Sequence, residues 1–389
     1  MTSTPTPVQN VERGLRRRVG DFWQRVTEGL AMDQLWGQFK SEARATYGLY
    51  SKDVDWDAIS REGKKWKRPF LAAWALFQAM LMKLSPARRV LLLIAVVMLI
   101  FNPDIRWSGG EFSIQLAPFG ALILFLLLAL ELADRVTMKR DLEIAREIQQ
   151  WLVPDHPPLV EGMDLAFATR PQNTVAGDYY DAFVRPAVDG EAGAPLLVAV
   201  ADVAGKSVPA AMLMATFQAS LHALAATPES LDEIVAGLNR YASAHSLEGR
   251  RFTTAFLAEI DPRTREMRFV NAGHNDPVLR RAGGAIERLT TGGPPFGMPP
   301  LSDKDISYAS GRLRLEPGDL LFVFTDGVIE AVNEANQEFS EARLLGELTA
   351  APAETAAETL KRVMAAVNTF VGAARQHDDI TCLVLRVAG

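Results

Sequence analysis

Four aspartates lie at the ends of apolar segments between residue 178 and the end of the sequence. Asp326 follows the run LLFVFT and precedes a glycine, and Asp202 ends the run LLVAVAD. Asp178 stands in AGDYYDAF, and Asp379 directly precedes ITCLVLRV. A single Asp-Gly pair is a common turn. Carboxylates that border buried strands nevertheless need partners, because an unpaired buried charge costs several kcal/mol.

Few basic residues are available in these segments to neutralise the aspartates. Lys206 and His377 are the ones close to them in sequence. Ligand sets made only of oxygen suit hard cations, Mn²⁺ or Mg²⁺, and a carboxylate could bridge two such ions. Such a pair can activate a water and neutralise a phosphoryl group in transfer. Gly205 and Gly327 would let the backbone approach an ion or a phosphate closely.

Other side chains offer weaker candidates for chemistry. Ser207 lacks a neighbouring base, and Cys382 lies inside an apolar strand, where we expect it to be part of the core. A single cysteine also excludes a disulfide framework. His274 could act as a general acid, although a structural role in a turn is the preferred interpretation. His377 is either an orienting group of the metal loop or an ordinary loop residue.

Short β-like segments interleave with helical ones from residue 162 onward. The expected helices are Val208–Ala226, Ser230–His245 and Ala353–Val371. Several strands follow one another through short turns such as DPRTRE, which is typical of antiparallel sheet. We therefore expect a mixed α and β domain at 157–389, for which paired sheets are a natural solution.

Two continuous apolar runs, Val90–Phe101 and Leu116–Leu130, precede this domain. Each is shorter than the ~20 residues that comfortably cross a bilayer, so a pair of buried helices is the alternative. Neither run has a polar stripe. Basic residues flank the outer ends of the pair, whereas the loop between the runs has a single one; the flanking residues are Arg88, Arg89, Arg135, Lys139 and Arg140. This bias predicts a two-span transmembrane hairpin at 87–134 with both ends in the cytoplasm.

The N-terminal region, 1–86, is basic and helical in pattern, and its role is unknown. Residues 1–89 hold 16 Lys and Arg against 9 Asp and Glu, whereas the rest of the chain holds 25 against 38. Its first residues lack the apolar core of a cleavable signal. The apolar stretch Pro69–Leu84 would violate the charge bias if it spanned, so we expect it at the membrane interface or packed on the hairpin.

A linker helix is expected at 135–156, between the hairpin and the domain. Met138, Leu142, Ala145 and Leu152 recur on one side, with Gln149 interrupting the stripe. This stripe could form a short parallel coiled coil in a homodimer, or it could pack on its own domain. In the first case the stripe would be regulatory, because pairing could position the catalytic site.

Seven segments in order, from residue 162 to residue 387, resemble the PPM family of metal-dependent protein phosphatases in its bacterial SpoIIE/RsbU-like branch. They are AGDYYDAF, ADVAGKSVPAAMLMA, FTTAFLAEID, FVNAGHNDPVLRR, TGGPPFGM, LFVFTDGVIEA and HDDITCLVLRV. Each is weak alone, and the ordered series is specific. The resemblance implies an α+β fold of two packed, mostly antiparallel sheets flanked by helices. It also implies hydrolysis of phosphoserine or phosphothreonine on a protein.

The resemblance also implies a role for each aspartate. Asp202 is similar to the carboxylate that bridges both metals, and the backbone carbonyl of Val203 to a ligand of one of them. Asp326 and Asp379 resemble ligands of the other ion. Asp178 would bind metal directly or hold metal-bound water.

Two departures from the branch pattern stand in the site segments. Ser207 replaces a usual glycine and should be tolerated if its φ is negative, and Pro171-Gln172 replaces a usual Pro-Ala. Neither removes a ligand, so an active enzyme is expected.

The branch suggests a phosphorylated regulator as substrate, such as an anti-sigma-factor antagonist of the STAS type in a partner-switching stress-signalling pathway. The expected location is the cytoplasmic membrane. The alternative is a membrane-tethered, catalytically silent docking module. A metal nuclease would need a basic groove, and the acidic domain argues against nucleic acid as a partner.

Overall fold

The computed structural model describes residues 67–101, 104–106, 113–187, 194–246, 249–299, 306–350 and 355–388, with positions 54, 56 and 59. The chain divides into two compact units, Met1–Asp134 and Arg135–Gly389. Most of the basic region expected at 1–86 therefore lies outside the described residues.

The first unit contains apolar helices joined by a small β ribbon. Its elements are α4 (Arg68–Lys83), α5 (Pro86–Phe101), the antiparallel pair β1 (Asp104–Arg106) and β2 (Ser113–Gln115), and the start of α6 (Ala117–Trp151). Helices α5 and α6 approach closely at Gly120, where a Cβ would lie 2.9 Å from the carbonyl oxygen of Ala95. Small residues at such a contact are typical of helix pairs in membranes. Near the other end of α5, Arg88 Nη1 lies 2.6 Å from Asp134 Oδ2.

Helix α6 runs without a break from the second apolar run through the expected linker. The linker therefore does not begin as a separate element at residue 135, and the helix ends at Trp151, before Leu152 and Pro154. By length and composition, α6 could cross a membrane. Among the described helices, Val208–Ala225 passes the same test, but it is a core helix of the second unit. Helix α5 has 16 residues and is therefore shorter than the ~20 residues that comfortably cross a bilayer.

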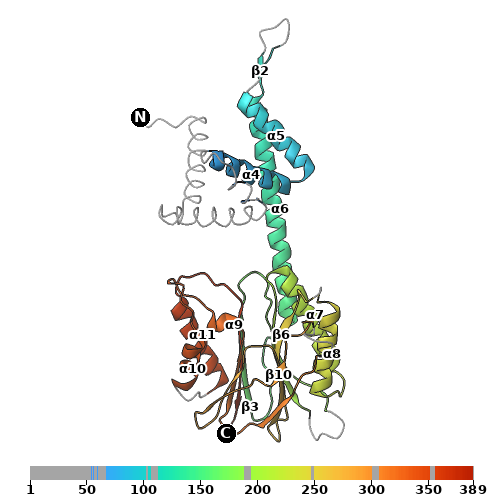
Figure 1. Cartoon of the computed structure of the whole chain (residues 1–389), viewed down its shortest axis with the longest axis vertical. Helices are drawn as coiled ribbons and strands as arrows, with labels where there is room; N and C mark the ends of the chain where they lie inside the picture. The colour runs from blue at the N-terminus through green and yellow to red at the C-terminus, as the bar shows by residue number, and fades with distance from the viewer. Residues whose placement is uncertain are drawn as a thin grey trace, which may run out of the picture. The chain divides into compact units, whose positions relative to one another are not determined.

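The second unit contains two β-sheets packed face to face (Figure 1). The first has the order β10-β7-β6-β5-β4 with β11 beside β7, and the second has the order β3-β13-β12-β8-β9. All pairs are antiparallel except β10 with β7. The strands are β3 (Met163–Arg170), β4 (Tyr179–Val184), β5 (Leu196–Val203), β6 (Thr253–Ile260), β7 (Glu266–Ala272), β8 (Val278–Arg280), β9 (Ile286–Arg288), β10 (Gly292–Gly293), β11 (Gly311–Arg314), β12 (Leu320–Phe324) and β13 (Ile380–Val387).

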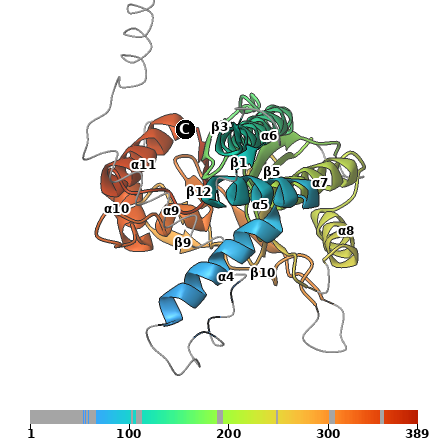
Figure 2. The same cartoon turned by 90° about the horizontal axis from the view of Figure 1, so that it is seen from above.

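The central strands β5, β6, β12 and β13 are buried on both faces because helices cover the outside of each sheet. Along β5, Val198 and Val200 join the core between the sheets, while Leu197 and Ala199 pack toward α7 (Val208–Ala225) and α8 (Leu231–Ala244). The other sheet is covered by α10 (Glu341–Ala350) and α11 (Ala356–Val371), as Figures 1 and 2 show. The expected fold of packed, mostly antiparallel sheets flanked by helices is confirmed.

The expected helices of this unit all form, with small differences at their ends. Helix α8 begins with a capping box, in which Ser230 and Glu233 satisfy each other's backbone N–H groups. Two helices were not expected from the sequence pattern, namely α10 and the single turn α9 (Asp326–Ile329).

Candidate active site

The four aspartates lie at one end of the two sheets. Asp178 directly precedes β4, and Asp202 is the penultimate residue of β5, which pairs with β4. Asp326 follows β12 at the start of α9, and Asp379 directly precedes β13, the partner of β12. The antiparallel pairing therefore brings one strand start and one strand end together in each sheet, as the sequence pattern predicts.

The carboxylates are close enough to affect one another's ionisation. Burial, and then the charge of Asp202, raise the pKa of Asp178 well above its usual range. Burial, with added repulsion from Asp326, Asp378 and Asp379, raises the pKa of Asp202 to about 7.

A fifth carboxylate, Asp378, belongs to the same cluster. Together with burial it raises the pKa of Asp326. Asp378 Oδ2 lies 2.9 Å from Lys206 Nζ, which also donates to the carbonyl of His377 at 2.6 Å. Lys206 is thus tied to the Asp378 loop. Asp378 directly precedes Asp379 in HDDITC, and this adjacency is the feature of the sequence from which its place in the cluster could have been predicted.

A shell of hydrogen bonds orients two of the aspartates. The Asp379 carboxylate accepts the backbone N–H groups of Gln172 and Gly177, both at 2.6 Å. Thr325 Oγ donates to Asp178 Oδ2 at 2.9 Å and accepts the N–H of Thr381 at 3.0 Å. These contacts join the 171–177 loop to the starts of β4 and β13. Because Gln172 acts here through its backbone, the departure from alanine at this position leaves the contact intact.

Gly327, which follows Asp326, lies against the backbone of Asp379. A Cβ at this position would lie 1.9 Å from the carbonyl oxygen of Asp379. The glycine therefore admits the Asp379 backbone beside Asp326. Gly205 has a φ of +119°, a backbone conformation that residues other than glycine rarely adopt.

The backbone at Ser207 does not have the negative φ at which serine would be tolerated in place of glycine. Its φ is +66° and its ψ is −149°, in a region that glycine occupies almost alone. The side chain makes no capping hydrogen bond to α7. The replacement of glycine is therefore strained at a position five residues after Asp202.

Gln149 does more than interrupt an apolar stripe. Its amide Nε2 donates to the carbonyl of Ala176 at 2.7 Å, and its Oε1 accepts the Ala176 N–H at 2.9 Å. Ala176 precedes Gly177, which binds Asp379. The end of α6 is therefore joined to the loop that carries Asp178, through a contact that no periodicity reveals.

The expected pairing stripe on α6 is half-buried at Leu142, Ala145 and Gln149, and Leu152 lies past the helix end. On a different side of the helix, Ile144, Ile148 and Trp151 are exposed at helical spacing; Trp151 is 81% exposed. Met138 is exposed as well. The exposed apolar face of the linker thus differs from the stripe expected to pair.

The remaining candidates have structural settings. His274 is buried, its backbone N–H donates to Asn271 Oδ1 at 2.7 Å, and burial lowers the pKa of its imidazole to about 4. A neutral imidazole cannot supply a proton at neutral pH, which favours the structural interpretation. His377 is exposed, and its carbonyl holds Lys206. Cys382 is fully buried, as expected, and burial raises its pKa.

The donor set fits hard cations. It consists of carboxylate oxygens and the Val203 carbonyl, which lies 3.4 Å from the position that a Cβ on Gly177 would take. In the described part of the chain, no three Asp, Glu, His or Cys side chains are grouped closely enough to hold an ion as they stand. The repulsion that raises the pKa of Asp202 is nevertheless what a divalent ion would relieve.

The fold and this site define a PPM-type phosphatase domain of the SpoIIE/RsbU-like branch. The chain belongs to the SpoIIE family, because the family model for stage II sporulation protein E matches residues 192–388. The chain is 27% identical over 252 residues to phosphoserine phosphatase RsbU of Bacillus subtilis, covering 64% of this chain and 70% of RsbU. It is 28% identical over 286 residues to protein IcfG of Synechocystis sp., covering 67% of this chain but 43% of IcfG.

The solved PP2C domain of SiaA from Pseudomonas aeruginosa has a similar fold. The TM-score is 0.56 at 23% identity, over 65% of this chain and 98% of that structure.

Proposed function

We propose that this chain is a Mn²⁺- or Mg²⁺-dependent protein serine/threonine phosphatase. The observation that carries the proposal is the cluster of five carboxylates at the strand ends, where burial and mutual repulsion raise the pKa of Asp178, Asp202 and Asp326, and where Lys206 pairs with Asp378. The likeness to a phosphoserine phosphatase supports the same reaction. A silent docking module would not need to retain such a costly cluster.

Each aspartate has a proposed task. Asp202 would lie between two ions, with the Val203 carbonyl on one of them and Asp326 and Asp379 on the other. When bound, such ions supply a reactive water at neutral pH and neutralise charge on the phosphoryl group. Asp178, oriented by Thr325, would bind an ion directly or hold the water in place.

The chain's own backbone keeps this arrangement in place. The N–H groups of Gln172 and Gly177 fix both oxygens of Asp379, so this carboxylate is oriented before any ligand arrives. Asp378 and the His377 carbonyl hold Lys206 at the exposed rim, where an anionic substrate would enter. Preorganised groups of this kind lower the reorganisation needed during the reaction.

The proposed substrate is a phosphorylated regulatory protein, such as a STAS-type anti-sigma-factor antagonist in a partner-switching pathway. The membership in the SpoIIE family supports this class of partner. The proposed location is the cytoplasmic membrane. Exposed apolar side chains on α5 and α6 support it, among them Ile100, Phe101, Phe125 and Leu128, which are 65–74% exposed.

Domain boundaries and control are part of the same proposal. Residues 87–134 would form the hairpin, and α6 would carry its state to the 171–177 loop through Gln149. If two copies pair, the exposed face with Ile144, Ile148 and Trp151 is the surface available for it. Pairing would then bias the position of the Asp178 loop.

An activity assay with a matched control tests the function. Purified full-length protein in detergent is given a phosphoserine peptide with Mn²⁺, with Mg²⁺, or with EDTA. We expect hydrolysis that requires a metal and is lost in Asp326→Asn, while Asp232→Asn, an exposed carboxylate on α8, remains active. Activity that survives both EDTA and Asp326→Asn would end the proposal. Folded protein without any activity would favour the docking module.

A further inference from the structure

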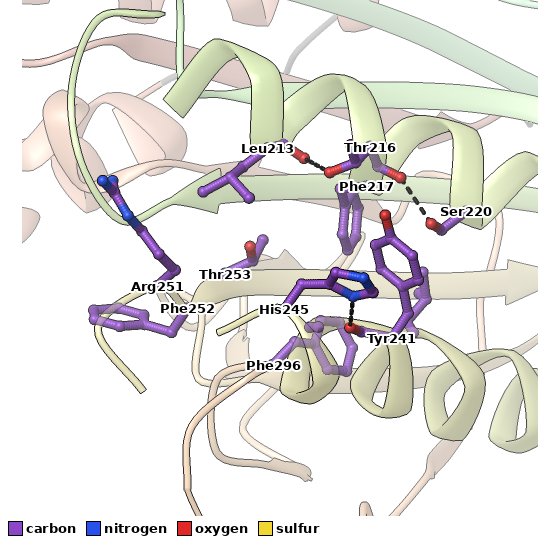
Figure 3. Close-up of a pocket in the computed structure, with 12 residues that line it drawn as sticks. Leu213, Thr216, Phe217, Ser220, Tyr241, His245, Arg251, Phe252, Thr253 and Phe296 are labelled. Carbon is purple, nitrogen blue, oxygen red and sulfur yellow. Dashed lines mark hydrogen bonds between the residues drawn. The ribbon is translucent and has the colours of Figure 1, made fainter. Parts of the chain in front are cut away.

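A pocket beside the carboxylate cluster has no role in the reaction described above. It lies between α7, α8 and the start of β6, and its volume is about 170 Å³. Figure 3 shows the rings of Phe217, Tyr241 and Phe296 around it, with Arg251 at one end. A cavity near 150 Å³ with an apolar lining is large enough for a benzene-sized group.

The strand register places the Arg251 end of the pocket against the metal loop. Thr253 in the pocket is the strand partner of Val203, and the N–H of Ala204 donates to the Phe252 carbonyl at 2.9 Å. Arg251 is therefore opposite Gly205. Its Nη1 lies 3.2 Å from the position that a Cβ on Gly205 would take. Arg251, a lining residue of the pocket, thus lies against Gly205, which is three residues after Asp202.

The polar groups that line the pocket are mostly bonded to their own helices. Thr216 Oγ donates to the Leu213 carbonyl, Ser220 Oγ donates to the Thr216 carbonyl, and His245 Nδ1 lies 2.9 Å from the Tyr241 carbonyl (Figure 3). The lining therefore presents mainly apolar surface, which suits an apolar side chain better than a polar one.

Arg251 differs from these groups. Within the ranges that the structure describes, its guanidinium has no hydrogen-bond or ion-pair partner. Lys206, the other cation at this rim, is already engaged by Asp378. An unpaired guanidinium beside a phosphate-processing site is complementary in charge and shape to a phosphoryl oxygen pair.

We propose that Arg251 and this pocket form a substrate-recognition site, in which Arg251 binds the phosphoryl group and the pocket takes an aromatic or leucine-sized side chain near the phosphoserine. This inference rests on the proposed function and specifies its substrate class, namely a phosphoprotein segment with a large apolar residue close to the phosphorylated one. Because Gly205 and the pocket are close together, a single segment of the substrate protein could place its phosphoryl group at Arg251 and its apolar side chain in the pocket.

A peptide panel tests the site in the full-length protein in detergent with Mn²⁺. One phenylalanine is moved through the four positions on either side of phosphoserine, in a glycine-serine background. Hydrolysis is followed by phosphate release, and affinity is measured separately by fluorescence anisotropy with Asp326→Asn. We expect one position to improve both affinity and kcat/KM about tenfold over the peptide without phenylalanine.

Two variants separate the parts of the site. Arg251→Gln should raise KM about tenfold for every phosphopeptide and change kcat less, whereas Arg263→Gln, an exposed arginine in the β6–β7 turn, should change neither. Ser220→Phe, which fills the pocket, should remove the preference for the phenylalanine position. Melting temperatures confirm that each variant is folded.

The two proposals fail in different ways. Metal-dependent hydrolysis with no preferred position and an unchanged KM in Arg251→Gln would overturn the recognition site and leave the phosphatase. A position-dependent affinity that is lost in Arg251→Gln, with no hydrolysis by the wild-type protein, would support the recognition site and reject the phosphatase.

Discussion

Replacing Asp202 by asparagine should stabilise the metal-free protein and destabilise the metal-bound one. In the absence of ions, the Asp202 carboxylate is largely buried among Asp326, Asp378 and Asp379, and its pKa is raised from 3.8 to about 7. A raised pKa in the folded state means that protonation stabilises the fold. This stability is complete below pH 3.8 and is lost as the pH rises through 7.

The size of the effect follows from this shift. Between pH 5.5 and pH 8, ionising Asp202 in the folded state should cost about 2 kcal/mol, at about 1.4 kcal/mol per pH unit below the raised pKa. For a unit of this size, 1 kcal/mol corresponds to roughly 2–4 °C in Tm. The Tm advantage of Asp202→Asn in EDTA should therefore shrink by about 4–8 °C on going from pH 8 to pH 5.5. Ionisation of His274 is common to both proteins and cancels.

The assay is thermal unfolding of the unit Arg135–Gly389 in EDTA and in saturating Mn²⁺. With Mn²⁺ at 100 times its Kd, one bound ion stabilises the wild type by about 2.7 kcal/mol. The order of stability at pH 8 should then reverse. The reasoning is refuted if Asp202→Asn lowers Tm equally with and without metal, or if the difference in EDTA does not change with pH.

Three further substitutions test the packing around the site. Gly327→Ala should lower the free energy of unfolding by about 1–3 kcal/mol, because the Asp379 carbonyl stands 1.9 Å from the new Cβ; an unchanged urea midpoint would show that the two loops are not in contact. Ser207→Gly should raise stability by about 1 kcal/mol by releasing the strain at φ +66°, and a loss of stability would contradict this backbone conformation. Arg185→Leu should cost about 3–5 kcal/mol, since it removes the buried guanidinium that lies 2.7 Å from the Glu259 carboxylate; the double variant with Glu259→Leu should regain much of this, and simple additivity would count against the pair.

The sequence predicted the fold and the positions of the aspartates because both follow from local rules. A strand that is apolar on both faces must be covered on both sides by other elements of the fold. Two strands joined by a short turn pair with each other in antiparallel orientation. Asp178, Asp202, Asp326 and Asp379 each border such a run, so the strand pairing brings them together.

Contacts between distant segments were not accessible to the same reasoning. The pair of hydrogen bonds between Gln149 and Ala176 and the approach of Asp379 to Gly327 join residues whose proximity no spacing encodes. The φ of Ser207 is likewise set by the loop between β5 and α7, so the sequence could state the condition of a negative φ but not predict that it fails. Arg251 becomes notable only when the register of β5 and β6 places it opposite Gly205.

Calorimetric titration of Mn²⁺ into the metal-free protein tests the central claim most directly. The claim is that the carboxylates at the strand ends form a binuclear metal site. We predict two ions per chain for the wild type, weakened binding of one ion in Asp379→Asn, and loss of both in Asp202→Asn, with Asp232→Asn unchanged. A wild-type protein that binds no Mn²⁺, or an Asp202→Asn protein that binds two ions with unchanged affinity, would contradict the account.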